Sequence, residues 1–450
     1  MPQSSPIAAE QGLQRLLTAG QMTMVAVGGS IGTGLLLGSA AAIEIAGPGV
    51  ILSFVFAAFI NFTVALSLGE LATTHPAAGS FGVYADLYLS EWAGFISRAG
   101  YWAAISISVG AELVASATYM QHWFKFIPAL VWVAAFSFFM LLINLRSVGD
   151  YGRFEFWFAM IKLVTIAIFI MVGAGLLLTG RVAPQYTAQG GFLPNGALAP
   201  LLAISLALYT FGGVEFVAIT TGESRSPGEI PKAIRMTFGT LTSLYLGAIV
   251  VLVGVVPWNH AGVTESPFVT VFRYISIPGA AGVMNFVVLT AALSGANAAL
   301  YVASRMLFSL ARAGWAPARL GNLNRQGSPK IALFASAYGI VLALLLEKFA
   351  PKDAFLWILD GALFGLMLSW LVSLAAHVQF RRRISPSTLA SLPFKSPLGA
   401  TGSVVGFTLV SAAILHTWWS SRPAMFSGLI YFVVLTVGYV LLRKGHAARS

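Results

Sequence analysis

The sequence predicts an all-α polytopic membrane protein, and three observations carry this prediction. Of the 450 residues, 58% are hydrophobic and only 9% are charged, whereas soluble domains carry about 25% charged residues. The mean hydropathy is +0.83. The apolar residues also form long continuous runs, unlike the alternating pattern of membrane barrel strands. A soluble globular fold and an intrinsically disordered chain are therefore excluded.

Twelve apolar runs are long enough to cross a bilayer, which takes about 17–25 residues. Helices are expected for all of them, because lipid offers no partners for exposed backbone groups. The first six runs span 22–45, 49–71, 92–124, 128–146, 154–179 and 198–222. The second six span 233–257, 279–313, 330–349, 354–379, 402–421 and 424–443.

The first run is expected to be a membrane span rather than a cleaved signal. Residues 1–21 are polar, without the basic segment and short apolar core of a secretory signal. The run ends at Glu44 and at residues 46–48 (AGP), with no small-residue cleavage site. At the other end, residues 444–450 form a short basic tail.

The positions of Lys and Arg predict the topology. Of the 26 basic residues, 19 fall on the side that holds both termini, six fall on the other side, and Lys162 falls within the fifth span. Because cytoplasmic loops carry the excess of basic residues, both termini are predicted to be cytoplasmic. The net charge of +11 is spread over short loops, so it indicates topology rather than nucleic-acid binding.

Glycine-rich breaks interrupt the first and the sixth span near their middles. Residues 28–34 read GGSIGTG, and residues 211–215 read FGGVE. Each glycine destabilises a helix by about 1 kcal/mol relative to alanine. Broken helices at corresponding positions of two halves are typical of a transporter's substrate site. Close packing through small residues is the alternative for either break alone.

The exposed backbone groups of these breaks suit a zwitterion, for which an α-amino acid is the obvious candidate. A half-helix that starts after the first break presents N–H groups and a positive dipole end to an anion. The expected N–H donors belong to Gly32, Thr33 and Gly34. The carbonyls expected to hold a cation lie near Ser30, Ile31, Tyr209 and Gly212. Thr210 and Phe211 complete the predicted substrate site.

Three ionisable residues within spans are candidates for proton coupling or gating. Lys162 lies mid-span, where a charge costs at least about 2.5–3.5 kcal/mol on insertion scales. Glu215 follows the second break, where a carboxylate complements the dipole of a half-helix. Glu112 lies one turn after Ser108 and is expected to face the cavity. A purely structural role stays open for each of them.

Four further residues are candidates for lining the pocket: Ser106, Val109, Ser294 and Asn297. For Ser294 and Asn297, hydrogen bonding between helices is an equal alternative. The small and apolar residues near the breaks favour a neutral amino acid, aliphatic or aromatic.

The breaks and several motifs together resemble the amino acid permeases of the amino acid–polyamine–organocation superfamily, and in particular their bacterial amino acid transporter branch. The motifs occur in order along nearly the whole chain: 28–34 (GGSIGTG), 46–48 (AGP), 69–71 (GEL), 78–81 (AGSF), 111–113 (AEL), 155–162 (EFWFAMIK), 211–215 (FGGVE) and 304–308 (SRMLF).

The resemblance implies the leucine-transporter-type fold, with spans 1–5 and 6–10 as inverted repeats and two peripheral helices. The first repeat would cover 22–179, the second 198–379 and the peripheral helices 402–443. In similar proteins a lysine at the position of Lys162 takes the place of a sodium ion. This implies proton coupling and a contact between Lys162 and carbonyls near Val27 or Gly28. The resemblance also implies the bacterial inner membrane.

The predicted function is therefore secondary active import of neutral L-amino acids by proton symport, with amino acid exchange as the alternative. No cofactor is expected beyond the proton as coupling ion, and no nucleic acid or obligate protein partner. An enzyme would need a nucleophile–base pair or clustered metal ligands within the membrane, and neither pattern occurs. A channel would favour repeated filters or charge rings in an oligomer, whereas two unequal breaks in one chain favour a single occluded site.

Overall fold

The computed structural model describes residues 10, 12–144, 148–260, 266–275, 279–349, 354–420 and 422–447. The regular elements of this part of the chain are all helices, and its one β-type contact is an isolated bridge between Leu17 and Ser224. The cytoplasmic segments expected at 1–21 and 444–450 are only partly within the described residues.

The first five expected spans correspond to helices that begin and end within a few residues of the predicted bounds. The broken first span comprises α1 (Ala19–Ser30), the π-helical turn η2 (Gly34–Gly38) and α2 (Ser39–Ala46). The helices that follow are α3 (Val50–Thr74), α4 (Ser80–Tyr88), α5 (Glu91–Gln121), α6 (Ala129–Asn144) and α7 (Val148–Leu178).

The second half repeats this pattern with a second broken span. Its pieces are α8 (Ala199–Leu202), α9 (Ile204–Thr210), α10 (Phe216–Thr220) and the turn η4 (Thr221–Glu223). The remaining helices are α11 (Glu229–Val255), α12 (Pro267–Tyr274), α13 (Ala280–Arg312), α14 (Lys330–Ser336), α15 (Tyr338–Phe349), α16 (Ala354–Arg383), α17 (Pro386–Ser391), α18 (Gly399–Ser420) and α19 (Arg422–Ala447).

Eight helical stretches of the described chain are long and apolar enough to cross a membrane. The first, Ala19–Thr74, covers two predicted spans, and the shorter apolar helices Ala129–Asn144 and Lys330–Leu342 coincide with two others. The sixth predicted span is divided among pieces that are individually too short. The helices are thus consistent with twelve spans, a count that stays a prediction.

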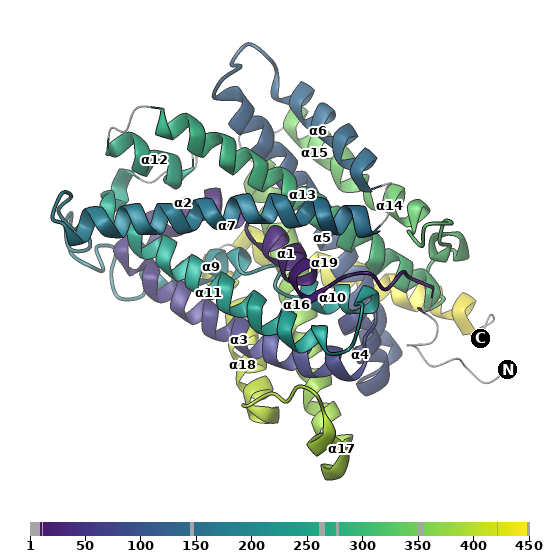
Figure 1. Cartoon of the computed structure of the whole chain (residues 1–450). Coiled ribbons are helices and arrows are strands. Elements are labelled where there is room, and N and C mark those ends of the chain that lie inside the picture. Colours follow the sequence, from purple (N-terminus) through teal and green to yellow (C-terminus); the bar gives the residue numbers. More distant parts are fainter. Residues whose placement is uncertain are drawn as a thin grey trace.

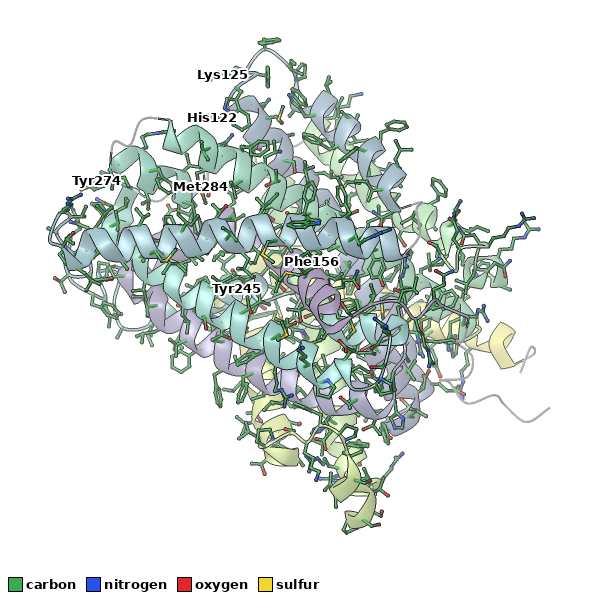
Figure 2. The ribbon with its side chains drawn as sticks, in the orientation of Figure 1. His122, Lys125, Phe156, Tyr245, Tyr274 and Met284 are labelled. Carbon is green, nitrogen blue, oxygen red and sulfur yellow. The ribbon has the colours of Figure 1, made fainter. Side chains whose placement is uncertain are left out.

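Helices α5 and α13 form the centre of the bundle and pack along each other. Within their most apolar windows, 83% of α5 and 94% of α13 is buried, against 28% for α18 and 17% for α19. Figure 1 shows α1 crossing in front of this centre, where it contacts α7, α11 and α13. In Figure 2, His122 and Lys125 lie at the upper end of the bundle, at the turn after α5, away from the ribbon of α1.

Local sequence explains where the two breaks begin. Helix α1 starts at a capping box in which Thr18 Oγ1 accepts from the Gln21 N–H and Gln21 Oε1 accepts from the Thr18 N–H. It stops at Ser30, after which Gly32 N donates to the Ser30 carbonyl. In the other break Gly213 has φ +103°, a left-handed conformation that glycine tolerates. A Cβ on Gly213 would lie 2.8 Å from Ser30 N, so the two breaks are in direct contact.

Candidate substrate site at the two helix breaks

A cavity lies where the two breaks meet, and it is closed by α5, α13 and α16. Seven of the predicted site residues line it, namely Ser30, Gly32, Gly34, Glu112, Tyr209, Gly212 and Glu215. The rest of the lining is mostly small or apolar: Gly29, Ile105, Ser108, Gly213, Phe216, Gly295, Ala299, Ala362 and Leu366. The hydroxyl of Ser30 is buried and has no hydrogen-bond partner among the described residues, so it is available to a bound molecule.

Two of the three predicted anion donors are already hydrogen-bonded within the protein. Thr33 N donates to Glu112 Oε1 at 3.1 Å and to Oε2 at 3.2 Å, and Thr33 Oγ1 donates to Oε1 at 3.1 Å. Gly32 N donates to the Ser30 carbonyl at 3.0 Å. A buried N–H group without a hydrogen-bond partner costs free energy. Oxygen atoms of the protein therefore accept from these two N–H groups. Glu112 therefore lines the cavity and also hydrogen-bonds the first break, while its role in proton coupling stays a prediction.

Thr210 and Phe211 do not line the cavity, although they belong to the second break. Thr210 Oγ1 donates to the Gly34 carbonyl at 3.3 Å and so links the two breaks. The ring of Phe211 is fully buried between Tyr245, at 4.9 Å between ring centroids, and Phe54, at 6.4 Å. Phe211 thus packs away from the cavity, behind the break.

Lys162 is fully buried and joins α7 to the first break. Its ammonium donates to the carbonyl of Gly28 at 2.5 Å and to that of Ile31 at 2.8 Å. In a regular helix the Gly28 carbonyl would accept from Gly32 N, but Gly32 N donates to Ser30 instead. The break thus frees a carbonyl and Lys162 binds it, so the expected contact with Gly28 is confirmed.

Glu215 connects the second break to two neighbouring helices. Its carboxylate accepts from Gly213 N at 3.1 Å, from the hydroxyl of Tyr101 on α5, and from Trp370 Nε1 on α16 at 3.3 Å. The carboxylate precedes α10, as predicted from its place after the break. A movement of α10 would therefore be transmitted to α5 and α16.

The four predicted pocket-lining candidates all lie outside the cavity lining. Ser294 and Asn297, on α13, donate to the carboxylate of Glu155 on α7, which agrees with the alternative of polar contacts between helices. Ser106 and Val109 are fully buried in α5. The Ser106 carbonyl lies against Gly339 of α15, where a Cβ would be 1.6 Å away, so the backbone of α5 packs closely against α15 at Ser106, while its neighbours Ile105 and Ser108 line the cavity.

A second buried polar cluster lies at one end of the bundle, where Glu10 meets the ends of α5 and α13. Glu10 accepts from Gly79 N at 2.7 Å and from the hydroxyl of Ser309. Arg98 donates to Ser309 Oγ at 2.7 Å and pairs with Asp86 at 2.7 Å. Burial raises the pKa of Glu10, although Arg98 and the hydrogen bonds from Ser309 and Gly79 oppose this shift. Glu10 is thus held against α13 and the turn before α4.

Sequence reasoning missed the lining contributed by Gly295 and Ala299 of α13 and by Ala362 and Leu366 of α16. A small residue in an apolar run carries no signal of which side it faces. It also assigned no role to Glu155, which was noted only as part of the 155–162 motif. Its position seven residues before Lys162, and so on the same face of α7, was the signal that could have found it.

A family model described as Amino acid permease matches residues 21–448. The chain belongs to the amino acid permease family. This permease is 36% identical over 442 residues to the aromatic amino acid transport protein AroP of Escherichia coli strain K12, with 96% of each chain covered. It is 34% identical over 440 residues to the uncharacterized amino acid permease YtnA of Bacillus subtilis strain 168, covering 96% of this chain and 95% of YtnA.

A solved structure shares the fold of this permease. It is the crystal structure of the Eremococcus coleocola manganese transporter in complex with an aromatic bis-isothiourea substituted compound, with a TM-score of 0.54 and 13% sequence identity. The match covers 96% of this chain and 94% of the transporter. The leucine-transporter-type fold is thus confirmed, while this likeness says nothing of the substrate.

Proposed function

We propose that this permease imports neutral L-amino acids by proton symport, with aromatic side chains preferred. The observation that carries the proposal is the bridge from the Lys162 ammonium to the carbonyls of Gly28 and Ile31, beside a cavity between two broken helices. Such carbonyls would otherwise suit a monovalent cation. The ammonium of Lys162 occupies the place that a metal ion would take. Protonation and deprotonation of Lys162 would therefore replace binding and release of a metal ion.

The proton would act by holding or releasing the first break. The charged ammonium ties α1 to α7, whereas a neutral amine has fewer protons to donate and no charge to attract two carbonyls. Loss of the proton therefore weakens the link between the broken helix and α7. In alternating access, one group of helices moves against the other around the site. The hydrogen bonds of Lys162 join the broken helix α1 to α7, so their loss would let these two helices move relative to each other.

The lining of the cavity favours a neutral substrate with a large apolar side chain. Gly295, Ala299 and Ala362 leave room, and Ile105 and Leu366 provide apolar walls. The name of the AroP relatives, aromatic amino acid transport protein, agrees with this choice. Glu112 and Glu215 already have hydrogen-bond partners within the protein, so neither is set aside for a cationic side chain. We propose cytoplasmic termini from the bias of Lys and Arg. We propose the bacterial inner membrane from the resemblance to bacterial amino acid permeases.

Uptake into proteoliposomes tests the proposal. Vesicles without internal amino acid are given radiolabelled phenylalanine, tyrosine, tryptophan, leucine or lysine, with and without an inward proton gradient. We expect the aromatic amino acids to accumulate only when the gradient is present, and lysine not to accumulate under either condition.

Two other results would contradict the proposal in different ways. Uptake that requires amino acid inside the vesicles, and ignores the gradient, would make the permease an exchanger. Accumulation that follows a sodium gradient at constant pH would show that Lys162 does not replace the coupling ion.

A further inference from the structure

Glu155 is a fully buried carboxylate that the transport cycle described above does not use. It lies on α7, and its Oε1 accepts from the hydroxyl of Ser294 while its Oε2 accepts from Asn297 Nδ2 at 2.9 Å. Asn297 Oδ1 in turn accepts from Asn144 Nδ2 of α6 at 2.7 Å. All direct partners of the carboxylate among the described residues are therefore neutral, although buried carboxylates in proteins usually have a cationic partner.

Glu155 and Lys162 approach the same glycine of the first break. They are seven residues apart on α7, which places them on one face of the helix, about 10 Å apart along its axis. Lys162 Nζ binds the Gly28 carbonyl at 2.5 Å. A Cβ on Gly28 would lie only 2.1 Å from Glu155 Oε1. The backbone of Gly28 thus lies between the ammonium of Lys162 and the carboxylate of Glu155.

The other charged groups around this position are committed to each other. Tyr151, one turn before Glu155 on α7, stacks on Tyr301 of α13 with 4.2 Å between ring centroids. Arg305 of α13 pairs with Glu223 of η4 at 3.1 Å, and Tyr301 also donates to Glu223. Glu112 of α5 is hydrogen-bonded to Thr33 and also lies within electrostatic reach of Lys162, and α1 contributes no titratable side chain. Among the described residues, Lys162 is therefore the cation that balances Glu155, its stronger electrostatic partner of the two.

We propose that Glu155 is a second proton-binding site of the transport cycle and takes up the proton that Lys162 releases. In this step an N–H bond of the Lys162 ammonium breaks and an O–H bond forms on Glu155 Oε1. The amine and the carboxylic acid that result are both neutral. The pair has zero net charge before and after, so the transfer itself adds no net charge to the low-dielectric interior. This inference rests on the proposed proton symport.

The hydrogen bonds of Glu155 suit both protonation states. Ser294 can donate to the carboxylate, or rotate its hydroxyl and accept from the acid. Asn297 has no such freedom, because its carbonyl oxygen is held by Asn144 and its amide must donate. The proton is therefore directed to Oε1, the oxygen nearer Gly28, while Oε2 stays an acceptor.

The decisive variant is Glu155→Gln, which has the shape and hydrogen bonds of the protonated acid but cannot release a proton. In proteoliposomes we expect it to retain exchange of internal for external amino acid. Gradient-driven accumulation should fall about tenfold, within the usual range for coupling between two sites. Proton uptake accompanying the substrate, followed with a pH-sensitive dye, should be lost. Glu155→Asp keeps a titratable group and should restore part of the gradient response.

Thr290→Val is the matched control. Thr290 lies one turn before Ser294 on α13, and within the described chain its hydroxyl bonds to the nearby Val287 carbonyl alone. It should behave as the unmodified permease. If the Glu155→Gln variant accumulates substrate to within about twofold of the level reached by the unmodified permease, the inference is overturned.

Infrared difference spectra between acidic and alkaline pH separate this inference from the proposed function. A protonated-carboxyl band that disappears in Glu155→Gln and shifts in Glu155→Asp supports the proton site. This result would hold even if uptake by the unmodified permease did not respond to a proton gradient and the symport proposal failed. A band unchanged in Glu155→Asp overturns the proton site, and this comparison stands even if Glu155→Gln does not fold.

Discussion

The carboxylate of Glu112 holds the backbone N–H of Thr33 at 3.1 Å and its hydroxyl at 3.1 Å, directly after the break in the first span. The protein's own carboxylate thus occupies a donor that was predicted for the carboxylate of the substrate. A bound amino acid and Glu112 would compete for the same N–H group, which connects substrate binding to the position of α5.

Replacing Glu112 by Ala should make stability depend more strongly on substrate. Without Glu112 the Thr33 N–H has lost its partner, at a cost of about 1–3 kcal/mol for a buried group, and the carboxylate of a bound amino acid can replace it. We expect a lower Tm in detergent without substrate and a larger rise on adding phenylalanine than in the unmodified permease. Glu112→Gln keeps an acceptor and serves as the control. An equal rise in all three proteins would contradict the competition.

Replacing Lys162 by Met should abolish gradient-driven accumulation. The carbonyls of Gly28 and Ile31 lose their donor, and no proton can be exchanged at this position. We expect accumulation to fall by about tenfold or more in the proteoliposome assay. Lys162→Arg keeps a donor that stays protonated, so it should preserve folding and still lose accumulation. Normal uphill transport by either variant would refute a coupling role.

A methyl group at Gly28 should disrupt the first break. The added Cβ would lie 2.1 Å from Glu155 Oε1, whereas a Cβ on Gly175 of the neighbouring α7 has no atom within 4 Å. Overpacking of this kind destabilises by about 1–3 kcal/mol. Gly28→Ala should therefore lower both Tm and uptake, and Gly175→Ala should change neither. Uptake by Gly28→Ala equal to that of the unmodified permease would show that Gly28 and the carboxylate of Glu155 are not in close contact.

The hydroxyl of Tyr101 should matter because it binds Glu215. Tyr101→Phe removes one of three donors to a buried carboxylate, with an expected loss of about 1.5–3 kcal/mol. Tyr119, on the same helix, has a buried hydroxyl without a partner in the described part of the chain. Tyr119→Phe should accordingly have no effect on Tm or on the rate of uptake. Equal Tm values for the two variants would argue against the link between α5 and α10.

Docking of Glu10 against Gly79 and Ser309 should depend on pH. Burial raises the pKa of the docked Glu10, so the docked state binds more protons than the undocked state. Docking should therefore tighten as the pH falls toward the ordinary range of a glutamate, about 4.3, and weaken as the pH rises. Hydrogen exchange of the Gly79 amide measures this, corrected for its intrinsic pH dependence. Glu10→Gln should show no such trend, and parallel profiles would exclude Glu10 as the cause.

The helices and both breaks were predictable because they depend on local composition. Apolar runs predicted the helices to within a few residues, and clustered glycines identified the breaks. The family motifs also made the contact between Lys162 and Gly28 predictable from the sequence. By contrast, Phe211, Ser294 and Asn297 were assigned to the pocket and lie outside its lining. In a helix surrounded by protein and lipid, every face is apolar, so periodicity does not reveal which residues face the cavity.

The sequence by itself determined the membrane architecture, the two helix breaks and the family, because these depend on composition and on the order of motifs. Only the tertiary structure decided which groups meet at the breaks. It brought Glu112 to Thr33, Tyr101 to Glu215, and Glu155 against Gly28, over separations of 79, 114 and 127 residues. Such pairings depend on how helices rotate and cross when small residues let their backbones approach, and no local pattern in the sequence records those angles.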